Sequence, residues 1–278
     1  MAQKVWMITG ASRGLGAEVA KAALAAGEKI IATGRARSGL NFAADQESLL
    51  SLEMDVTDQT QIETAVKKGL SRFSRIDVLV NNAGFGLLGA IEETTAEQVE
   101  RIYRTNVFGL LNVVRAVLRT MRQQRAGHII NFSSLGGFRA SAGWGVYCST
   151  KFAVEGITEA LHDELAPLGI HATVVEPGFF RTDFMDNRSL ADTGQQIADY
   201  AETVGKTRLF VVERNHLQPG DPVKFAQAIL QLANAPNPPL RLPLGSDALQ
   251  RIIDKGAFVA QEMREWRALS ESTDFTTV

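Results

Sequence analysis

Short apolar runs alternate along this chain with longer segments of helical periodicity. The seven runs that predict β-strands are Val5–Thr9, Lys29–Thr33, Ser51–Met54, Val78–Asn81, His128–Ser133, His171–Glu176 and Leu240–Leu244. Four segments with helical spacing lie between them, namely Leu15–Ala26, Thr60–Ser71, Ala96–Arg122 and Gly145–Leu168. Apolar strands that alternate with helices are typical of a parallel sheet covered on both faces. The pattern predicts an α/β fold, a doubly wound parallel sheet of about seven strands with helices on both faces.

One polar, weakly periodic stretch, residues 182–218, interrupts this alternation. In a compact domain an insertion of that length is usually a lid or a binding loop. Asp221 and Pro222 then suit the N-cap and first position of another helix, and helical spacing returns over Ser246–Leu269. No fixed-period repeat or low-complexity linker is apparent, so residues 1–278 are expected to form a single domain with a substrate lid at about 182–218.

Composition narrows the class of protein. The chain has 278 residues, a formal net charge of -2 and a pI of about 6.1. No basic field is therefore available to attract nucleic acid or an anionic membrane. The single cysteine, Cys148, excludes an internal disulfide and fits a reducing compartment. A secretory signal and an apolar run of the roughly 18–20 residues that span a bilayer are not apparent, so a cytoplasmic protein is expected.

The turn after the first predicted strand is rich in glycine. It reads Gly10-Ala11-Ser12-Arg13-Gly14-Leu15-Gly16 and leads directly into a helix. Glycines let the backbone turn tightly and approach a pyrophosphate, while the helix N-terminus offers free N–H groups and partial positive charge. A glycine-rich turn alone also suits an ordinary loop. Its position between strand and helix favours a Rossmann-type nucleotide site that uses Gly10, Ser12, Arg13, Gly14, Leu15 and Gly16.

The end of the second predicted strand indicates which nucleotide binds. An acidic residue there would accept hydrogen bonds from the ribose 2′-hydroxyl of NAD and repel a 2′-phosphate. This chain instead has Gly34 and Arg35, and Arg13 lies in the glycine-rich turn. Two guanidinium groups can hold a phosphate, and Arg37 is a less certain third candidate. These arginines could be ordinary surface residues, but the missing carboxylate favours NADP(H) over NAD(H).

Tyr147 and Lys151 are four residues apart in a segment of helical periodicity, so their side chains share one face. A tyrosine of ordinary pKa, about 10, exchanges protons poorly at neutral pH, and a neighbouring ammonium brings its pKa closer to the working range. Such a pair could also be a surface pair. However, Ser133 and Ser134 end one strand and Asn81–Gly84 end another, where the ligands of open α/β sheets bind.

These motifs form a recognisable set. In chain order they are Thr9–Gly16, Asp55, Asn81–Gly84, Asn106, Ser134, Tyr147-x-x-x-Lys151 and Pro177-Gly178. The set resembles the short-chain dehydrogenase/reductase superfamily, in its compact single-domain branch. The resemblance extends from Val5 to Thr182, and beyond Thr182 the family is variable.

The resemblance implies a role for each site residue. Tyr147 would be the general acid in carbonyl reduction and the base in alcohol oxidation, with Lys151 lowering its pKa and holding the nicotinamide ribose. Ser134 would stabilise charge on the substrate oxygen, and Asn106 would anchor a water next to Lys151. The other implied cofactor contacts are Asp55, Val56, Asn82, Ala83, Gly84, Pro177, Gly178 and Thr182. The family also implies a homodimer or homotetramer, formed through the long helices Ala96–Arg122 and Gly145–Leu168, although the sheet alone could cover their apolar faces.

Apolar residues flank the catalytic groups and suggest the kind of substrate. The candidates are Phe85, Leu87, Leu88, Leu135, Phe138, Trp144, Phe179, Phe180 and Met185. Many of them could belong to the core. Together with the resemblance to hydroxysteroid- and retinol-type members, they favour a small-molecule substrate that is a lipophilic ketone, aldehyde or secondary alcohol. The cellular supply of NADPH would favour reduction.

The histidines do not predict a metal site. None of His128, His162, His171 and His216 pairs with a cysteine or carboxylate at the spacing that metal ligands require. Adjacent acidic residues do not change this, because consecutive positions on a helix point apart.

Three alternatives remain open from the sequence. The first is an NAD-dependent alcohol dehydrogenase, and the second is a non-catalytic protein that senses NADP. The third is a methyltransferase, which also uses a glycine-rich first turn but whose methyl donor carries no 2′-phosphate to meet Arg13 and Arg35. A binding protein would keep its function when Tyr147 is replaced by phenylalanine, whereas a dehydrogenase would not.

Overall fold

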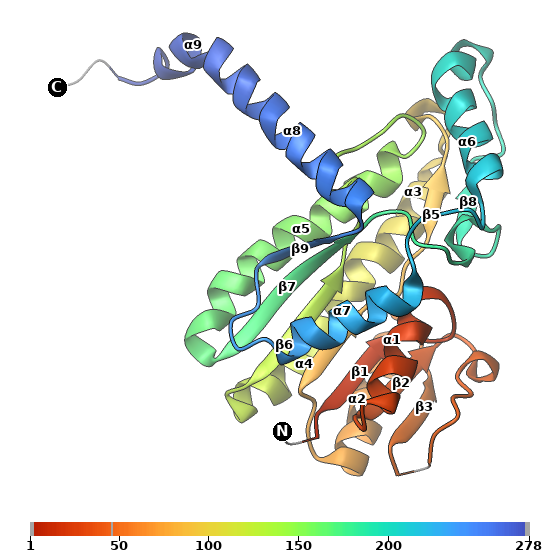
Figure 1. Ribbon diagram of the computed structural model, residues 1–278, viewed down its shortest axis with the longest axis vertical. Coiled ribbons are helices and arrows are strands. Elements are labelled where there is room, and N and C mark those ends of the chain that lie inside the picture. Colours follow the sequence, from red (N-terminus) through yellow and green to blue (C-terminus); the bar gives the residue numbers. More distant parts are fainter. Residues whose placement is uncertain (1–2, 46, 276–278) are drawn as a thin grey trace.

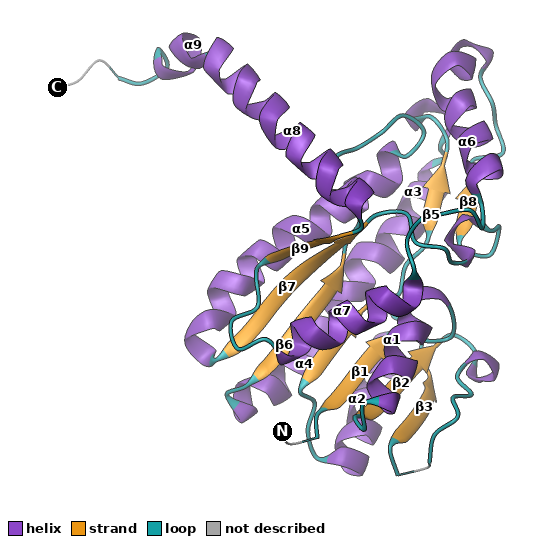
Figure 2. Ribbon diagram, in the orientation of Figure 1, coloured by secondary structure: helices purple, strands orange, loops and turns teal. Residues whose placement is uncertain are grey.

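Seven parallel strands form a single sheet in the computed structural model, which describes residues 3–45 and 47–275. Their spatial order is β3 (Leu49–Glu53), β2 (Lys29–Gly34), β1 (Val5–Thr9), β4 (Val78–Asn81), β6 (Gly127–Phe132), β7 (Ile170–Pro177) and β9 (Arg241–Leu244) (Figure 2). The prediction of a doubly wound parallel sheet is confirmed. Strand order reverses between β1 and β4, which is the point where open α/β sheets bind ligands.

Helices cover both faces of the sheet (Figure 1). On one face α1 (Gly14–Ala25) packs beside α7 (Pro222–Asn234), and on the other lie α2 (Gln59–Phe73), α4 (Leu110–Gln124) and α5 (Gly145–Leu165). Successive residues of a strand point to opposite faces, so Met7 of β1 joins the core under α2, α4 and α5, whereas Ile8 joins the core under α1 and α7. The continuous apolar strands follow from burial on both faces.

The segment Ala96–Arg122 is helical throughout, as its spacing predicts, but it is not one uniform α-helix. The structure divides this segment into α3 (Ala96–Tyr103), a π-helical turn (Arg104–Gly109) and α4. Gly109 lies against Val56, and a Cβ atom on Gly109 would come within 2.6 Å of the Val56 side chain. The π-turn therefore depends on tertiary contacts, which apolar periodicity does not reveal.

The polar segment that interrupts the sequence pattern contains regular structure. β8 (Leu190–Asp192) pairs in parallel with β5 (Gly86–Leu88), and α6 (Lys206–Arg214) follows. Strands of three residues are too short to leave a period-2 signal, which explains why neither was predicted.

The chain ends in α8 (Ser246–Glu265) and α9 (Arg267–Glu271), which extend away from the sheet (Figure 1). Within α8, which lies wholly in the described part of the chain, Ala248 is the one buried residue. Among residues 3–45 and 47–275, no helix combines the length and apolar character needed to cross a bilayer.

Asp221 caps α7, as its position before Pro222 predicts. Its Oδ1 accepts hydrogen bonds from the amides of Val223 at 2.8 Å and Lys224 at 3.3 Å. Asp221→Ala removes this acceptor, so urea denaturation should show the free energy of unfolding lowered by about 1 kcal/mol. Asp221→Asn keeps an acceptor oxygen and should stay close to the unmutated protein. Equal losses in the two variants would contradict the capping role.

Candidate active site

A cleft of about 620 Å³ opens at the carboxyl ends of the strands. Among the catalytic and cofactor-binding residues predicted from the sequence, those that line it are Gly10, Ser12, Arg13, Gly14, Leu15, Arg35, Asp55, Val56, Asn82, Ala83, Gly84, Ser134, Tyr147, Lys151, Pro177, Gly178 and Thr182. Gly16 and Asn106 lie behind the wall of the cleft and support it. Residues from distant parts of the chain therefore meet in one cavity.

The glycine-rich turn fits a pyrophosphate. Gly10 and Gly14 have φ angles of +64° and +57°, a conformation that favours glycine. Gly16 packs so closely that a Cβ atom there would lie 2.7 Å from the Gly10 carbonyl oxygen. Helix α1 has no side-chain cap at Arg13 and no acidic residue in its first turn. Its first amides therefore remain available to an anion, which is the chemistry that a dinucleotide phosphate requires.

Asn82 joins this turn to the end of β4. Its Nδ2 donates to the carbonyl oxygens of Thr9 and Gly10, both at 2.9 Å. In return, the Thr9 hydroxyl accepts hydrogen bonds from the amides of Asn82 and Ala83, both at 3.1 Å. These bonds fix two walls of the cleft at the switch point of the sheet.

The two arginines singled out for a 2′-phosphate have different surroundings. Arg35 is exposed at the rim of the cleft and has no hydrogen-bond or ion-pair partner among the described residues. Arg13 Nη2 donates to the Arg188 carbonyl oxygen at 2.7 Å and to Ser189 Oγ at 2.9 Å. Arg13 thus links the glycine-rich turn to the 182–218 segment, a contact that the sequence did not predict.

Ser134 and Tyr147 meet inside the cleft. Ser134 lies two residues after the end of β6, and its Oγ accepts a hydrogen bond from the Gly136 amide at 3.0 Å. Tyr147 lies in the first turn of α5, between the rings of Trp144 and Phe184, each with its centroid 5.7 Å away. Burial raises the pKa of Tyr147, and a hydrogen bond with Ser134 offsets part of that effect. The phenol is therefore protonated at neutral pH in the absence of bound ligand.

Lys151 lies one helical turn after Tyr147 and is 7% exposed. Its Nζ donates to the Phe132 carbonyl oxygen at 2.8 Å and lies 5.9 Å from the centroid of the Tyr147 ring. Burial lowers the pKa of Lys151 to about 8, and the negative charge of Glu155 opposes that shift. A cation is thus held beside the phenol.

Asn106 occupies the π-helical turn behind these groups. Its amide nitrogen donates to the Phe85 carbonyl oxygen at 3.0 Å and to Thr150 Oγ1 at 3.1 Å. Its amide oxygen accepts a hydrogen bond from the Phe85 N–H at 3.1 Å. Asn106 therefore joins the loop after β4 to α5. The water that the family resemblance implies at this side chain stays a prediction.

The substrate end of the cleft is mostly apolar. Six of the predicted residues line it, namely Phe85, Leu135, Trp144, Phe179, Phe180 and Met185. Leu87 and Leu88 are instead buried in core clusters, and Phe138 packs under the guanidinium of Arg241. The sequence did not single out Phe184, Thr207, Phe210 or Arg251, which also line the cleft. Phe184 adjoins the family motif, whereas no local signal marks the other three.

The start of α8 completes this end of the cleft. Asp247 Oδ2 accepts a hydrogen bond from the Phe179 amide at 2.7 Å. The Asp247 carboxylate packs so closely on Gly178 that a Cβ atom there would collide with it. Arg251, one helical turn later, lies over the Phe179 ring with its guanidinium carbon 5.8 Å from the centroid.

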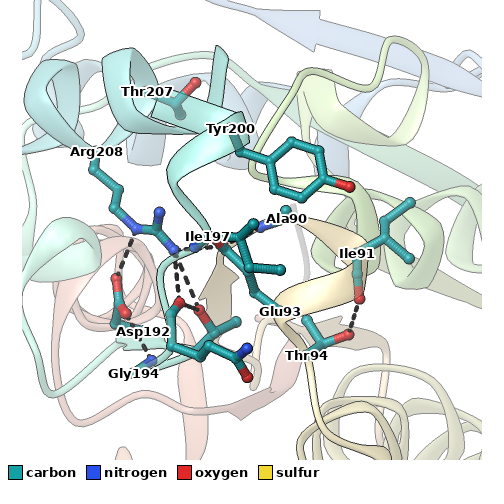
Figure 3. A network of polar contacts seen from close by, with 12 residues as sticks. Ala90, Ile91, Glu93, Thr94, Asp192, Gly194, Ile197, Tyr200, Thr207 and Arg208 are labelled. Carbon is teal, nitrogen blue, oxygen red and sulfur yellow. Dashed lines mark hydrogen bonds and ion pairs between the residues drawn. The ribbon is translucent and has the colours of Figure 1, made fainter. Parts of the chain in front are cut away.

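A buried ion pair attaches α6 to the body of the protein (Figure 3). Arg208 Nη2 donates to Glu93 Oε2 at 2.6 Å, and the side chains are 13% and 0% exposed. The amides of Ala90 and Ile197 also donate to the Glu93 carboxylate, at 2.7 and 2.8 Å. A weaker contact of 3.4 Å joins Arg208 to Asp192, which is 46% exposed. The pair fixes the part of α6 that carries Thr207 and faces the cleft.

No group of three or more potential metal ligands from His, Cys, Asp and Glu occurs among the residues that the structure describes. His128 contacts the Thr173 hydroxyl at 2.9 Å and lies edge-on to His171. Burial lowers the pKa of His128 to about 3, so this imidazole is neutral within the sheet.

A glycine-rich turn at the switch point of a doubly wound sheet, with Ser134, Tyr147 and Lys151 beside it, defines a dinucleotide-dependent oxidoreductase. The family model described as short chain dehydrogenase matches residues 4–193. The chain belongs to the short-chain dehydrogenase/reductase family and is an NAD(P)-dependent oxidoreductase that acts on CH–OH or C=O groups.

Relatives match nearly the whole chain. Oxidoreductase BOA17 of Botryotinia fuckeliana (strain B05.10) is 37% identical over 270 residues, which cover 96% of this chain and 98% of the relative. A 3-ketodihydrosphingosine reductase of Bacteroides thetaiotaomicron is 38% identical over 245 residues, covering 88% and 89%. The crystal structure of a short-chain dehydrogenase from Streptomyces avermitilis has a TM-score of 0.92 at 40% identity, covering 99% of this chain and all of that one.

Two more distant solved structures contain a nicotinamide cofactor. ElxO with NADP bound is 27% identical with a TM-score of 0.72, covering 90% of this chain and 100% of that chain. A 3-ketoacyl-(acyl-carrier-protein) reductase from Brucella melitensis complexed with NADH is 26% identical with a TM-score of 0.72, covering 87% and 96%. Related proteins thus bind either cofactor, and similarity alone selects neither.

Burial alone would raise the pKa of Glu93, but hydrogen bonds from Arg208 and the amides of Ile197 and Ala90 outweigh it and lower the pKa to about 2. A depressed folded-state pKa means that the stabilisation is fully present above the ordinary value of 4.5 and is lost as pH falls towards 2. The ion pair should therefore hold α6 in place at any pH above about 4.5.

Glu93→Gln should free α6 from the protein body, because it leaves the charge of Arg208 without its buried partner, a loss of about 3–5 kcal/mol. Limited proteolysis at pH 7 should then cleave within residues 190–214 much faster than in the unmutated protein. Asp192→Asn, which alters only the exposed partner of Arg208, is the matched control and should change cleavage little. Equal cleavage of the two variants would show that the buried pair does not hold the segment.

Proposed function

We propose that this protein is an NADPH-dependent carbonyl reductase acting on a lipophilic ketone or aldehyde. The observation that carries the proposal is that Ser134, Tyr147 and Lys151 line one cleft together with Arg35. No carboxylate directly follows β2 at the end of the cleft where Arg35 lies. Turnover of carbonyl compounds with NADPH by the purified protein tests it directly.

The chain's own residues would supply the proton and the positioning, while the bound nicotinamide supplies the hydride. Burial keeps the Tyr147 phenol protonated, so it can donate to the carbonyl oxygen as that oxygen gains negative charge. The Ser134 hydroxyl, hydrogen bonded to Tyr147, would stabilise the same oxygen. The Lys151 ammonium would stabilise the phenolate that forms.

The preference for NADP(H) is supported by charge at the adenosine end. Gly34 leaves the end of β2 without a carboxylate, and Arg35 offers an exposed guanidinium at the rim of the cleft. Arg13 lines the same end, although its Nη2 is bonded to Arg188 and Ser189. A 2′-phosphate would find charge-assisted donors here, and no carboxylate directly follows β2 to repel it.

The lipophilic substrate class is supported by the side chains at the other end of the cleft. Trp144, Phe179, Phe184, Met185 and Phe210 supply an apolar lining next to Tyr147. The Bacteroides thetaiotaomicron relative is named for a ketone of this kind, 3-ketodihydrosphingosine. The supply of NADPH in cells favours reduction over oxidation.

We also propose that residues 1–278 act as a single domain in which the 182–218 segment covers the substrate. That segment contributes Phe184, Met185 and Phe210 to the cleft. A homodimer or homotetramer is proposed as well, because Phe108 beside α4 and Phe152 on α5 are 53% and 46% exposed. These apolar residues lie on the long helices that the family resemblance implies for subunit contacts.

Replacing the proposed acid separates an enzyme from a cofactor-binding protein. Tyr147→Phe should lower kcat/KM for carbonyl reduction by about 10²- to 10⁴-fold, because it removes the proton donor. NADPH affinity, followed by fluorescence, should change only a few-fold. Tyr103→Phe is the matched control, since the Tyr103 hydroxyl bonds Ser149 at 2.9 Å and does not line the cleft. Full turnover by Tyr147→Phe would refute the catalytic role.

Reversing the charge of Arg35 at the adenosine end of the cleft tests the proposed preference for NADPH over NADH. Arg35→Asp should weaken NADPH binding by about 10- to 100-fold, because it removes one charge-assisted hydrogen bond to the 2′-phosphate and adds repulsion. NADH binding should stay equal or improve in the same fluorescence titration. Arg264→Asp introduces the same charge on α8, outside the cleft, and serves as control. If the unmutated protein binds NADH as tightly as NADPH, the proposed preference is wrong.

A further inference from the structure

A cluster of charged side chains lies buried behind Lys151. Glu155 follows Lys151 by one helical turn on α5, so the two side chains share a face. Glu155 and Glu176 are 5% and 0% exposed, and Arg241 of β9 bridges them. Arg241 Nη1 donates to Glu155 Oε2 and, at 3.2 Å, to Glu176 Oε1, while its Nη2 binds the half-exposed Glu159.

Two buried carboxyl groups, those of Glu155 and Glu176, share one cation, the Arg241 guanidinium. Each has one oxygen on Arg241, and Glu176 Oε2 has no hydrogen-bond partner among the described residues. The nearby Ser133 hydroxyl is directed at the Lys151 carbonyl oxygen, at 3.4 Å. A carboxylic proton shared by the two groups would provide the missing donor, as in other closely spaced carboxyl pairs.

The pKa shifts of the two carboxyl groups agree with a shared proton. Burial raises the pKa of Glu155 to about 7 and the charge of Glu176 adds to the effect, while a hydrogen bond with Ser133 and the charge of Arg241 oppose it. Burial raises the pKa of Glu176 too. The Nζ of Lys151 donates to a neutral acceptor, the Phe132 carbonyl oxygen, so Glu155 is the group that supplies negative charge near this ammonium.

We propose that Glu155 and Glu176 form an acid pair that shares one proton, is fixed by Arg241, and keeps Lys151 in its ammonium form beside Tyr147. Glu155 does not line the cleft, so it is a positioning residue that acts through Lys151. When the pair loses its shared proton to solvent, both carboxyl groups are negatively charged, and the Lys151 ammonium is stabilised further. The inference rests on the proposed function, because it uses the role given there to Lys151.

Two isosteric variants distinguish this electrostatic role from packing. Glu155→Gln leaves the remaining negative charge on Glu176 of β7, whereas Glu176→Gln keeps it on Glu155, one turn from Lys151. Glu155→Gln should lower the pKa of Lys151 by about one unit, and Glu176→Gln should leave it nearly unchanged. Glu159→Gln removes the exposed partner of the same guanidinium and is the matched control.

The readout is an NMR titration of protein labelled with ¹³C at lysine Cε, in which Lys151→Met assigns the Lys151 signal. A second readout is the pH profile of kcat/KM for carbonyl reduction. Its high-pH limb should move to lower pH in Glu155→Gln alone. Glu155→Asp, which keeps the charge, should return the limb most of the way to its position in the unmutated protein.

An unchanged Lys151 titration in folded Glu155→Gln would overturn the inference. Equal shifts in Glu155→Gln and Glu176→Gln, or no recovery in Glu155→Asp, would overturn it too, since these results indicate disturbed packing. If the Lys151 titration shifts as expected while the unmutated protein reduces no carbonyl compound, the acid pair is supported and the proposed function fails instead.

Discussion

The close approach of the first βα turn to the end of β4 is the contact on which the site depends. Gly16 has no room for a Cβ atom next to the Gly10 carbonyl oxygen, and Asn82 bonds the carbonyl oxygens of Thr9 and Gly10. One side of this contact leads to the uncapped N-terminus of α1. The other leads through the π-helical turn, where Asn106 holds the loop after β4, to α5 and its catalytic face. The side chains of Asn82 and Asn106 therefore connect the cofactor wall to the helix that carries the proton donor.

The sequence predicted the sheet because its seven strands are short apolar runs, most of which are separated by helical segments. It predicted most of the cleft for a related reason, since parallel strands bring their carboxyl ends to one edge and the motif residues follow those ends. The π-helical turn and the pair β5 and β8 were missed because they depend on contacts rather than on local periodicity. Glu93 and Arg208 are 115 positions apart and carry no shared signal, so their ion pair could not be predicted.

Two buried ion networks show how the number of donors decides the protonation of a carboxyl group. Glu93 receives hydrogen bonds from one guanidinium and two backbone amides, and its pKa falls to about 2. Glu155 and Glu176 share a single guanidinium between them, and burial raises the pKa of each. The first arrangement gives a permanent charge suited to attaching a helix. The second gives a group that titrates in the range where an enzyme works.

The start of α8 has a consequence for how substrate preference can diverge among related chains. Asp247 and Arg251 meet Phe179 in the cleft, while the rest of the helix extends away from the sheet (Figure 1). Sequence change after β9 can therefore alter what the cleft accepts without affecting any strand of the sheet. The region after β9 is then a place where sequence change can alter specificity at little risk to folding.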